Sequence, residues 1–222
     1  MIYSYIKNFL LIHKLVLKKY SILRIMQILE IKKIKFNGSI LDLGSKKSGS
    51  NVTNFINSNE NINYADKYSN NANDLKIDLE KNEDLNDIEY ENVLLMNVLE
   101  HVFNFKNCLN NSYKILSKNG NFYGSTPFFF RIHESPNDYF RYTEQSLIVI
   151  LNEAGFKNIS IKVIGGGIFL CFYNSISTIF NIIPLLNNLL LIFCQILDFI
   201  ISLFSKNFKK IYPLGYFFFA EK

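Results

Sequence analysis

From Ser39 onward, the sequence alternates short apolar runs with stretches of helical periodicity. This alternation is typical of an α/β domain built on a mostly parallel sheet. We predict seven strands: residues 39–44, 61–66, a short strand within 74–80 that ends near Asp78, 91–97, 121–127, 158–164 and the C-terminal segment YFFFAEK. The sequence therefore predicts a doubly wound, mostly parallel α/β sheet.

The connections between these strands are predicted from helix and turn signals. The segment NVTNFINS opens a helix after the first strand, and Gly120 should end the helix FKNCLNNSYKILSKNG before the fifth strand. Thr143 is expected to cap a helix that ends at Gly155. Only KYSNNAN separates the second and third strands, so the usual crossover helix should be missing or rudimentary there.

The first 36 residues carry the positive charge of the chain. They hold eight Lys or Arg residues and one Glu, a net charge of +7, so the chain total of +5 leaves −2 for the remainder. Apolar residues at helical spacing, with Lys7, Lys14 and Lys18 on one face, predict an amphipathic helix or helix pair. Lysines inside the apolar run argue against a signal peptide. Two interpretations stay open: a flap packed on the domain, or a helix resting on anionic lipid.

A second unusual segment, residues 165–210, is apolar and lies just before the predicted last strand. Its second half is long enough to span a bilayer. Polar residues nevertheless recur on one helical stripe, at Asn188, Gln195, Asp198, Ser202 and Ser205. Because an Asp at the middle of a span costs about 2.5 to 3.5 kcal/mol, we expect a helical hairpin that covers a binding site or lies in a membrane surface, in preference to a true span.

The chain is thus predicted to have two parts: a basic helical segment 1–36 and a domain 37–222 that contains the 165–210 insertion. Hydrophobic residues make up 49% and charged residues 19%, which excludes a disordered chain and is compatible with a membrane surface. Three widely spaced Cys without a CxxC pair predict neither a disulfide framework nor a zinc site. We expect a cytoplasmic protein, free or peripheral on the inner membrane face, with no nucleic-acid partner; the sequence leaves the oligomeric state open.

The segment ILDLGSKKSGSNV combines a strand, a Gly turn and a helix start, which is where a doubly wound sheet binds a nucleotide-like ligand. Its spacing D-x-G-x-x-x-x-G is not the dinucleotide fingerprint, which disfavours a nicotinamide oxidoreductase. Asp42 suits a cationic part of a ligand, and Asp66, at the end of the second strand, can accept hydrogen bonds from ribose hydroxyls. The alternative is that both are solvated carboxylates at strand ends.

A family resemblance follows from several motifs together. ILDLGSKKSG, YADK, KIDLE and LLMNVLEHVFNFKNCLNNSYKILSKNGNFYGSTPFF resemble the class I S-adenosylmethionine-dependent methyltransferases of the type 11 group. HESPNDYFRYTEQSLIVILNEAGF and YPLGYFFFAEK resemble the branch found in bacterial surface-polysaccharide and glycolipid gene clusters. The resemblance covers residues 38–164 and the last ten. It implies a Rossmann-like methyltransferase fold with an antiparallel last strand, S-adenosyl-L-methionine as the cofactor, and no metal.

The resemblance also implies which residues bind the cofactor. The methionine part would be surrounded by Asp42, Gly44 and Gly49. Asp66 would bind the ribose hydroxyls, Asp78 the adenine amino group, and Asn97 with Val98 would lie near the sulfonium. The family pattern is usually D-x-G-x-G-x-G, whereas Ser45, Lys46 and Lys47 replace the middle glycine here with one extra residue.

Methyl transfer from a sulfonium is an in-line displacement, in which the protein aligns the reactants and removes a proton from a hydroxyl acceptor. His133, in the loop after the fifth strand, is expected to act as the base or to organise the loop, and Asp138 would orient it. Arg141 would bind a phosphate or carboxylate group or pair with Asp138. His101, in the motif LEHV, is the second candidate base, unless it bonds only to backbone.

These residues favour methyl transfer from S-adenosylmethionine to a small-molecule, glycan or lipid-linked acceptor at the cytoplasmic membrane face. The alternative is a methyltransferase-fold protein that has lost catalysis, given its altered glycine loop, and that serves as a membrane-associated partner in an assembly pathway.

Overall fold

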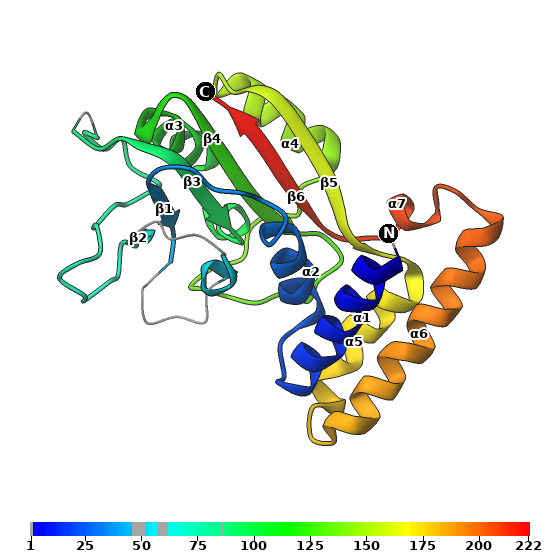
Figure 1. Cartoon of the computed structure of the whole chain (residues 1–222). Coiled ribbons are helices and arrows are strands. Elements are labelled where there is room, and N and C mark those ends of the chain that lie inside the picture. The colour runs from blue at the N-terminus through cyan, green and yellow to red at the C-terminus, as the bar shows by residue number, and fades with distance from the viewer. Residues whose placement is uncertain (1, 46–51, 57–61, 86) are drawn as a thin grey trace. The chain divides into compact units, whose positions relative to one another are not determined.

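The computed structural model describes residues 2–45, 52–56, 62–85 and 87–222. These residues form a mixed six-stranded sheet in the order β2-β1-β3-β4-β6-β5 (Figure 1). The strands are β1 (Ile40–Leu43), β2 (Ile62–Ala65), β3 (Tyr90–Met96), β4 (Leu116–Pro127), β5 (Lys157–Gly166) and β6 (Pro213–Glu221). The first four are parallel and the last are antiparallel. The predicted α/β class and antiparallel end of the sheet are confirmed, but the predicted number of seven strands is wrong.

The predicted third strand, 74–80, is reduced to one isolated parallel bridge between Leu75 and Ala65. The chain turns away after this bridge because the Asp78 carboxylate accepts a hydrogen bond from the backbone N–H of Glu80, and the Asp78 carbonyl accepts one from the N–H of Lys81. Such side-chain bonds to nearby backbone compete with strand pairing. The described residues between β2 and β3 contain no helix, as the sequence predicted.

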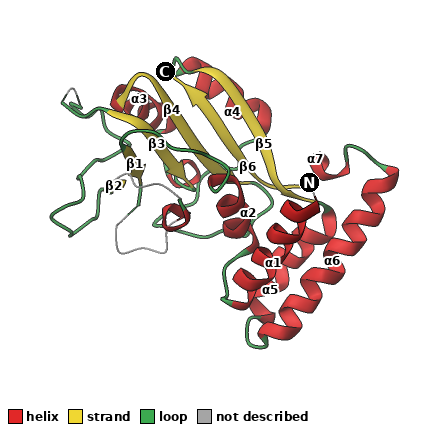
Figure 2. Ribbon diagram, in the orientation of Figure 1, coloured by secondary structure: helices red, strands yellow, loops and turns green. Residues whose placement is uncertain are grey.

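Short helices are associated with the sheet, as Figure 2 shows. They are η1 (Val52–Phe55), η2 (Leu99–His101), α3 (Phe105–Ile115) and α4 (Glu144–Glu153). Thr143 caps α4 through a capping box, and Gly155 follows its end with φ +94°, so both predicted ends are confirmed. The helix predicted after β1 appears, in the described residues 52–56, as the single turn η1.

Gly120 does not end the helix that precedes β4. Helix α3 ends at Ile115, because Leu116 already pairs with Tyr90 of β3. The ladder then shifts register, and the next pair joins Asn92 to Asn121. Gly120 lies in this irregular segment, where a Cβ would come 2.9 Å from the carbonyl oxygen of Ser117. Its lack of a side chain therefore permits a close backbone approach inside a strand.

The chain divides into two compact units. The sheet unit comprises Ile31–Pro127, Ile132–Lys162 and Tyr216–Lys222. Its core is a layer of fully buried strand residues. The ring of Phe122 in β4 stacks on that of Phe156, with centroids 4.7 Å apart, and packs against that of Phe218 in β6, with centroids 5.5 Å apart. The continuous apolar run of β3 is buried over its last five residues, which is the pattern of a central parallel strand.

The helical unit comprises Met1–Glu30, Phe128–Arg131 and Val163–Gly215. Its helices are α1 (Ile2–Leu17), α2 (Ile22–Ile31), α5 (Ile168–Phe180), α6 (Pro184–Phe204) and α7 (Phe208–Ile211). The predicted hairpin is present as α5 packed on α6, and α1 packs on α6 as well (Figure 1). Among the described residues, α6 alone is long and apolar enough to cross a membrane by length and composition.

Candidate functional site

The ends of three neighbouring strands bring the predicted cofactor residues to one edge of the sheet. Leu43 of β1 pairs with Ala65 of β2 on one side and with Leu95 of β3 on the other. The residues that follow these strands, Gly44, Asp66 and Asn97, therefore leave the sheet at the same edge. This edge, at the carboxyl ends of parallel strands, is where open α/β sheets bind ligands.

Gly44 makes a turn that only glycine fits well. Its φ is +74°, and its N–H donates a 2.7 Å hydrogen bond to the carbonyl of Ala65. A Cβ at this position would lie 2.5 Å from a methyl group of Val98, whose side chain is buried. Gly44 and Val98, which the sequence assigned to one site, are thus in direct contact.

Asn97 forms the sharp turn after β3. It adopts φ +57°, a conformation that Asn tolerates better than most side chains. Its N–H donates to the carbonyl of Ser125 at 2.9 Å, and its side-chain oxygen accepts from the Ser125 hydroxyl at 3.2 Å. These bonds fix the Asn97 side chain at the sheet edge next to Val98.

The two acids at this edge differ in exposure. Asp42 is almost completely buried within β1, and the Thr53 hydroxyl lies 3.5 Å from its carboxylate. Asp66 is half-buried and accepts a 2.7 Å hydrogen bond from the backbone N–H of Tyr68. Gly49, the remaining residue predicted for this turn, lies outside the described residues.

Asp78, predicted to bind adenine, is surrounded by cations. Its carboxylate lies 3.0 Å from the Lys67 ammonium and 3.6 Å from that of Lys81. Partial burial raises the pKa of Asp78, but the hydrogen bonds from Lys67 and from the Glu80 N–H outweigh it, so the pKa is lowered overall. The carboxylate is thus held ionised by its pair with Lys67.

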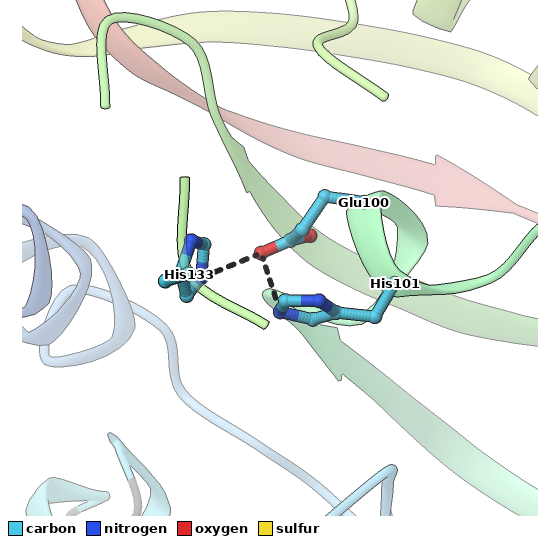
Figure 3. Close-up of side chains that lie close together, drawn as sticks. All are labelled: Glu100, His101 and His133. Atoms are coloured by element: carbon cyan, nitrogen blue, oxygen red, sulfur yellow. Dashed lines mark ion pairs between the residues drawn. The ribbon is translucent and has the colours of Figure 1, made fainter. Parts of the chain in front are cut away.

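The predicted acceptor residues gather around Glu100. Glu100 and His101 lie on η2, and His133 comes from the loop after β4 (Figure 3). The Nε2 atom of His101 is 3.7 Å from Oε1 of Glu100, and Nε2 of His133 is 3.9 Å from the same oxygen. The imidazole rings meet edge to face, with centroids 4.8 Å apart. Glu100 itself is completely buried.

Asp138 and Arg141 stabilise the loop that carries His133. The guanidinium of Arg141 donates to both oxygens of Asp138, at 2.5 and 2.7 Å. These hydrogen bonds from Arg141 hold the pKa of the Asp138 carboxyl well below its usual range. Asp138 also accepts from the backbone N–H of His133 at 2.9 Å, and its Oδ2 lies 3.3 Å from Nδ1 of the His133 ring. Of the two roles left open for Arg141, the structure shows the pair with Asp138.

The backbone joins this loop to η2. The carbonyl of Glu100 accepts hydrogen bonds from the N–H groups of Tyr139 at 2.7 Å and Phe140 at 3.3 Å. Neither Glu100 nor Lys67 was predicted as a site residue from the sequence. The motifs LEHV and YADK contain both residues, but burial of Glu100 and the approach of Lys67 to Asp78 depend on chain segments that are distant in sequence.

Comparison with known structures identifies the fold. No protein-family model matches the chain, and neither does any curated protein sequence. A SAM-dependent methyltransferase from Archaeoglobus fulgidus is similar over 95% of this chain and 94% of its own, with a TM-score of 0.55 and 14% identity.

Two further structures share the arrangement. A didemethyltoxoflavin N1-methyltransferase from Burkholderia thailandensis, solved with S-adenosylhomocysteine, has a TM-score of 0.53 and 12% identity and covers 90% of this chain and 78% of its own. The [4+2]-cyclase SpnF has a TM-score of 0.52 and 10% identity and covers 88% of this chain and 78% of its own. The chain therefore has the Rossmann-like fold of the class I S-adenosylmethionine-dependent methyltransferases.

Proposed function

We propose that this chain transfers a methyl group from S-adenosylmethionine to a small-molecule, glycan or lipid-linked acceptor. The observation that carries the proposal is the convergence of Gly44, Asp66 and Asn97 at the edge of the sheet. The methyltransferases of the same fold, among them one solved with S-adenosylhomocysteine, support it.

The residues at this edge fit the proposed cofactor. S-adenosylmethionine combines an ammonium group, a sulfonium and ribose hydroxyls, and it would supply the activated methyl group. Asp42 provides negative charge for the cationic part, and Asp66 provides a carboxylate acceptor for the ribose. The turn at Gly44 leaves backbone, with no side chain, between Asp42 and Val98. Asp78 would approach the adenine while bound to Lys67.

His133 is suited to take the proton from a hydroxyl acceptor. Its Nδ1 lies beside the ionised Asp138, so the ring presents Nε2 as the basic atom. Asp138, fixed by Arg141, thereby acts as a positioning residue for the imidazole. His101 provides a second imidazole 4.8 Å away, between centroids.

The resemblance to type 11 methyltransferases of surface-polysaccharide and glycolipid clusters supports an amphiphilic acceptor. A cavity of about 710 Å³ lies within the helical unit, and its lining includes Ile6, Phe9, Met26, Leu170 and the stems of Lys209 and Lys210. An apolar lining with cationic groups suits an acyl or isoprenoid chain that carries an anionic head.

We further propose that the helical unit associates with an anionic membrane surface on the cytoplasmic side. Helix α6 exposes large apolar side chains, including Phe193, Phe199 and Leu203. Lys7 and Lys14 of α1 are exposed as well. Binding to anionic vesicles should exceed binding to neutral ones and weaken with salt, because exposed charges are screened over about 8 to 10 Å. Equal binding to both vesicle types, or a fraction that resists alkaline carbonate, would contradict a peripheral, charge-assisted association.

The alternative is a protein of this fold that has lost methyl transfer and serves as a membrane-associated assembly partner. Ser45, Lys46 and Lys47 in place of the usual glycine favour it. The cyclase SpnF shows that the fold also carries other chemistry.

Calorimetric titration of the full chain with S-adenosylhomocysteine tests the proposal. We expect saturable binding that Asp66→Ala weakens by about 1.5 to 3 kcal/mol, because hydrogen bonds to a charged acceptor are lost. Asp87→Ala is the matched control, since Asp87 is exposed and precedes the amino end of β3, away from the carboxyl ends of the strands. This variant should bind as the wild type does. No detectable binding at millimolar ligand would remove the methyltransferase proposal and favour the alternative.

A further inference from the structure

Two imidazoles and one carboxylate converge in the cluster formed by Glu100, His101 and His133. Their ligand-type atoms all lie within 4.8 Å of one another, and Figure 3 shows both rings pointing toward the carboxylate. The three residues reach this point from different segments: η2 supplies Glu100 and His101, and the loop after β4 supplies His133.

Contacts outside the cluster set the orientation of both rings. Nδ1 of His101 lies 2.5 Å from the carbonyl oxygen of Asn137. A carbonyl only accepts hydrogen bonds, so Nδ1 of His101 carries the proton. Nδ1 of His133 lies 3.3 Å from Asp138, whose carboxylate accepts hydrogen bonds from the Arg141 guanidinium at both oxygens. In their neutral forms, both rings therefore direct an Nε2 lone pair toward Glu100.

This arrangement is the one that metal-binding histidines use. A ligating His places its other ring nitrogen against a carboxylate or backbone carbonyl, which fixes the tautomer and the ring plane. Here one ring has the carbonyl of Asn137 and the other has Asp138 in that role. Two imidazole lone pairs and a buried carboxylate directed at one point form a donor set of the kind that binds a cation.

The cluster must close around a cation, because its ligand atoms lie up to 4.8 Å apart. A tetrahedral ion with ligands at about 2.0 to 2.2 Å separates neighbouring ligand atoms by roughly 3.3 to 3.6 Å. The Nε2 atoms of His101 and His133 lie 3.7 and 3.9 Å from Oε1 of Glu100. Imidazole nitrogen favours first-row transition ions over magnesium or calcium, which prefer oxygen.

We propose that Glu100, His101 and His133 bind one first-row divalent transition cation, such as Zn²⁺, through Oε1 and the two Nε2 atoms. Three protein ligands leave at least one coordination position open, which is typical of catalytic sites rather than structural ones. The site departs from the metal-free expectation from the sequence. With the cation bound, Nε2 of His133 is a ligand, so the role of His133 as base applies only to the protein without the cation. The site does not depend on the proposed methyl transfer; only its use, to hold an acceptor oxygen, rests on that function.

Zinc titration of the full chain tests the site. After treatment with a chelator and its removal, we expect one Zn²⁺ per chain by calorimetry and by elemental analysis. Co²⁺ should give the visible bands of a four-coordinate ion. His133→Ala and His101→Ala should each weaken binding by more than 100-fold. His13→Ala is the matched control, because His13 is the third His of the chain and lies in the helical unit, with Nδ1 2.6 Å from Asn188.

A second variant separates ligation from folding. Asp138→Asn keeps the size of the side chain but removes the charge beside Nδ1 of His133, and such outer contacts change metal affinity by about 10- to 100-fold. We expect that loss in a variant whose circular dichroism matches the wild type. Stoichiometric zinc binding that persists in His133→Ala, or no binding by a folded wild type, would overturn the proposal. Zinc binding without S-adenosylhomocysteine binding would retain the metal site and remove the methyltransferase function.

Discussion

Two buried aspartates, one in each unit, show how the surroundings decide what a carboxylate does. Asp138, in the sheet unit, receives both arms of the Arg141 guanidinium, and its pKa is lowered. Asp198, on α6 of the helical unit, accepts hydrogen bonds from the backbone N–H groups of Phe169 at 3.0 Å and Leu170 at 2.8 Å, and Lys209 interacts with it through charge. Burial raises the pKa of Asp198 despite these bonds. A guanidinium keeps the first carboxylate ionised, whereas two amides do not fully replace water around the second.

Because their hydrogen-bond donors differ, the two aspartates also have different roles. Asp138 is a fixed anion beside His133, so it can set the orientation of a functional imidazole. Asp198 caps the N-terminus of α5 and joins the two helices of the hairpin. The same amino acid therefore positions a candidate site residue in one unit and fastens a hairpin in the other.

Removing the carboxylate of Asp138 should have the largest effect. Asp138→Ala removes the two carboxylate oxygens that accept hydrogen bonds from the partly buried guanidinium of Arg141, and breaking a buried ion pair costs about 3 kcal/mol or more. We expect this loss in the free energy of unfolding, measured with urea. Asp138→Asn should cost less, since the amide oxygen still accepts from Arg141. A loss below 1 kcal/mol for the alanine variant would mean that the pair contributes little.

Closing the space next to Asp198 should have the next largest effect. Gly167 has φ +126°, and a Cβ there would collide with the Asp198 carboxylate. Gly167→Ala should therefore lower stability by at least the cost of backbone strain, about 1 to 3 kcal/mol. Gly155→Ala is the control, because it has a similar φ of +94° but its Cβ would only reach ordinary contact with Tyr113, at 3.4 Å. If thermal unfolding shows that Gly167→Ala and Gly155→Ala lose the same amount of stability, then the collision with Asp198 adds nothing to the cost of backbone strain.

Truncating Asp198 should have a smaller effect than truncating Asp138. Asp198→Ala removes two hydrogen bonds at a helix N-terminus, and loss of such a cap costs about 0.5 to 2 kcal/mol. Asp198→Asn should be close to neutral at pH 7, because the amide oxygen still accepts and the buried charge is gone. Urea unfolding of the three proteins measures this order. An asparagine variant as unstable as the alanine variant would show that the charge itself is needed.

The smallest expected effect is an opposite pH dependence. The pKa of Asp138 is lowered from 3.8, so its contribution to stability is present above pH 3.8 and is lost as pH falls through the folded-state pKa. The pKa of Asp198 is raised from 3.8, so its contribution is greatest below pH 3.8 and is lost as pH rises through the folded-state pKa. The Tm difference between wild type and Asp138→Asn should grow with pH from pH 3, whereas the difference for Asp198→Asn should shrink or reverse sign. If both Tm differences change with pH in the same direction, the predicted opposite pH dependence of Asp138 and Asp198 is wrong.

An apolar segment predicted as a strand forms one in the structure where it pairs along its length with neighbouring strands. The run VLLM in β3 is buried on both faces and was predicted almost to its ends. The segment DLKIDLE shows a similar local pattern but forms only the bridge at Leu75, since Asp78 bonds to the following backbone. Which of two similar segments becomes a strand depends on neighbours that a local pattern does not contain.

The sequence by itself determined the order of the elements, the α/β class, the cap at Thr143 and the residues that follow the carboxyl ends of β1, β2 and β3. These features depend on local signals: periodicity, turn chemistry and capping. Only the tertiary structure decided that Glu100 lies buried between two imidazoles, that Arg141 pairs with Asp138, and that Asp198 caps α5. Each of these depends on how side chains approach one another after the chain folds, because burial and distance set their protonation and their partners.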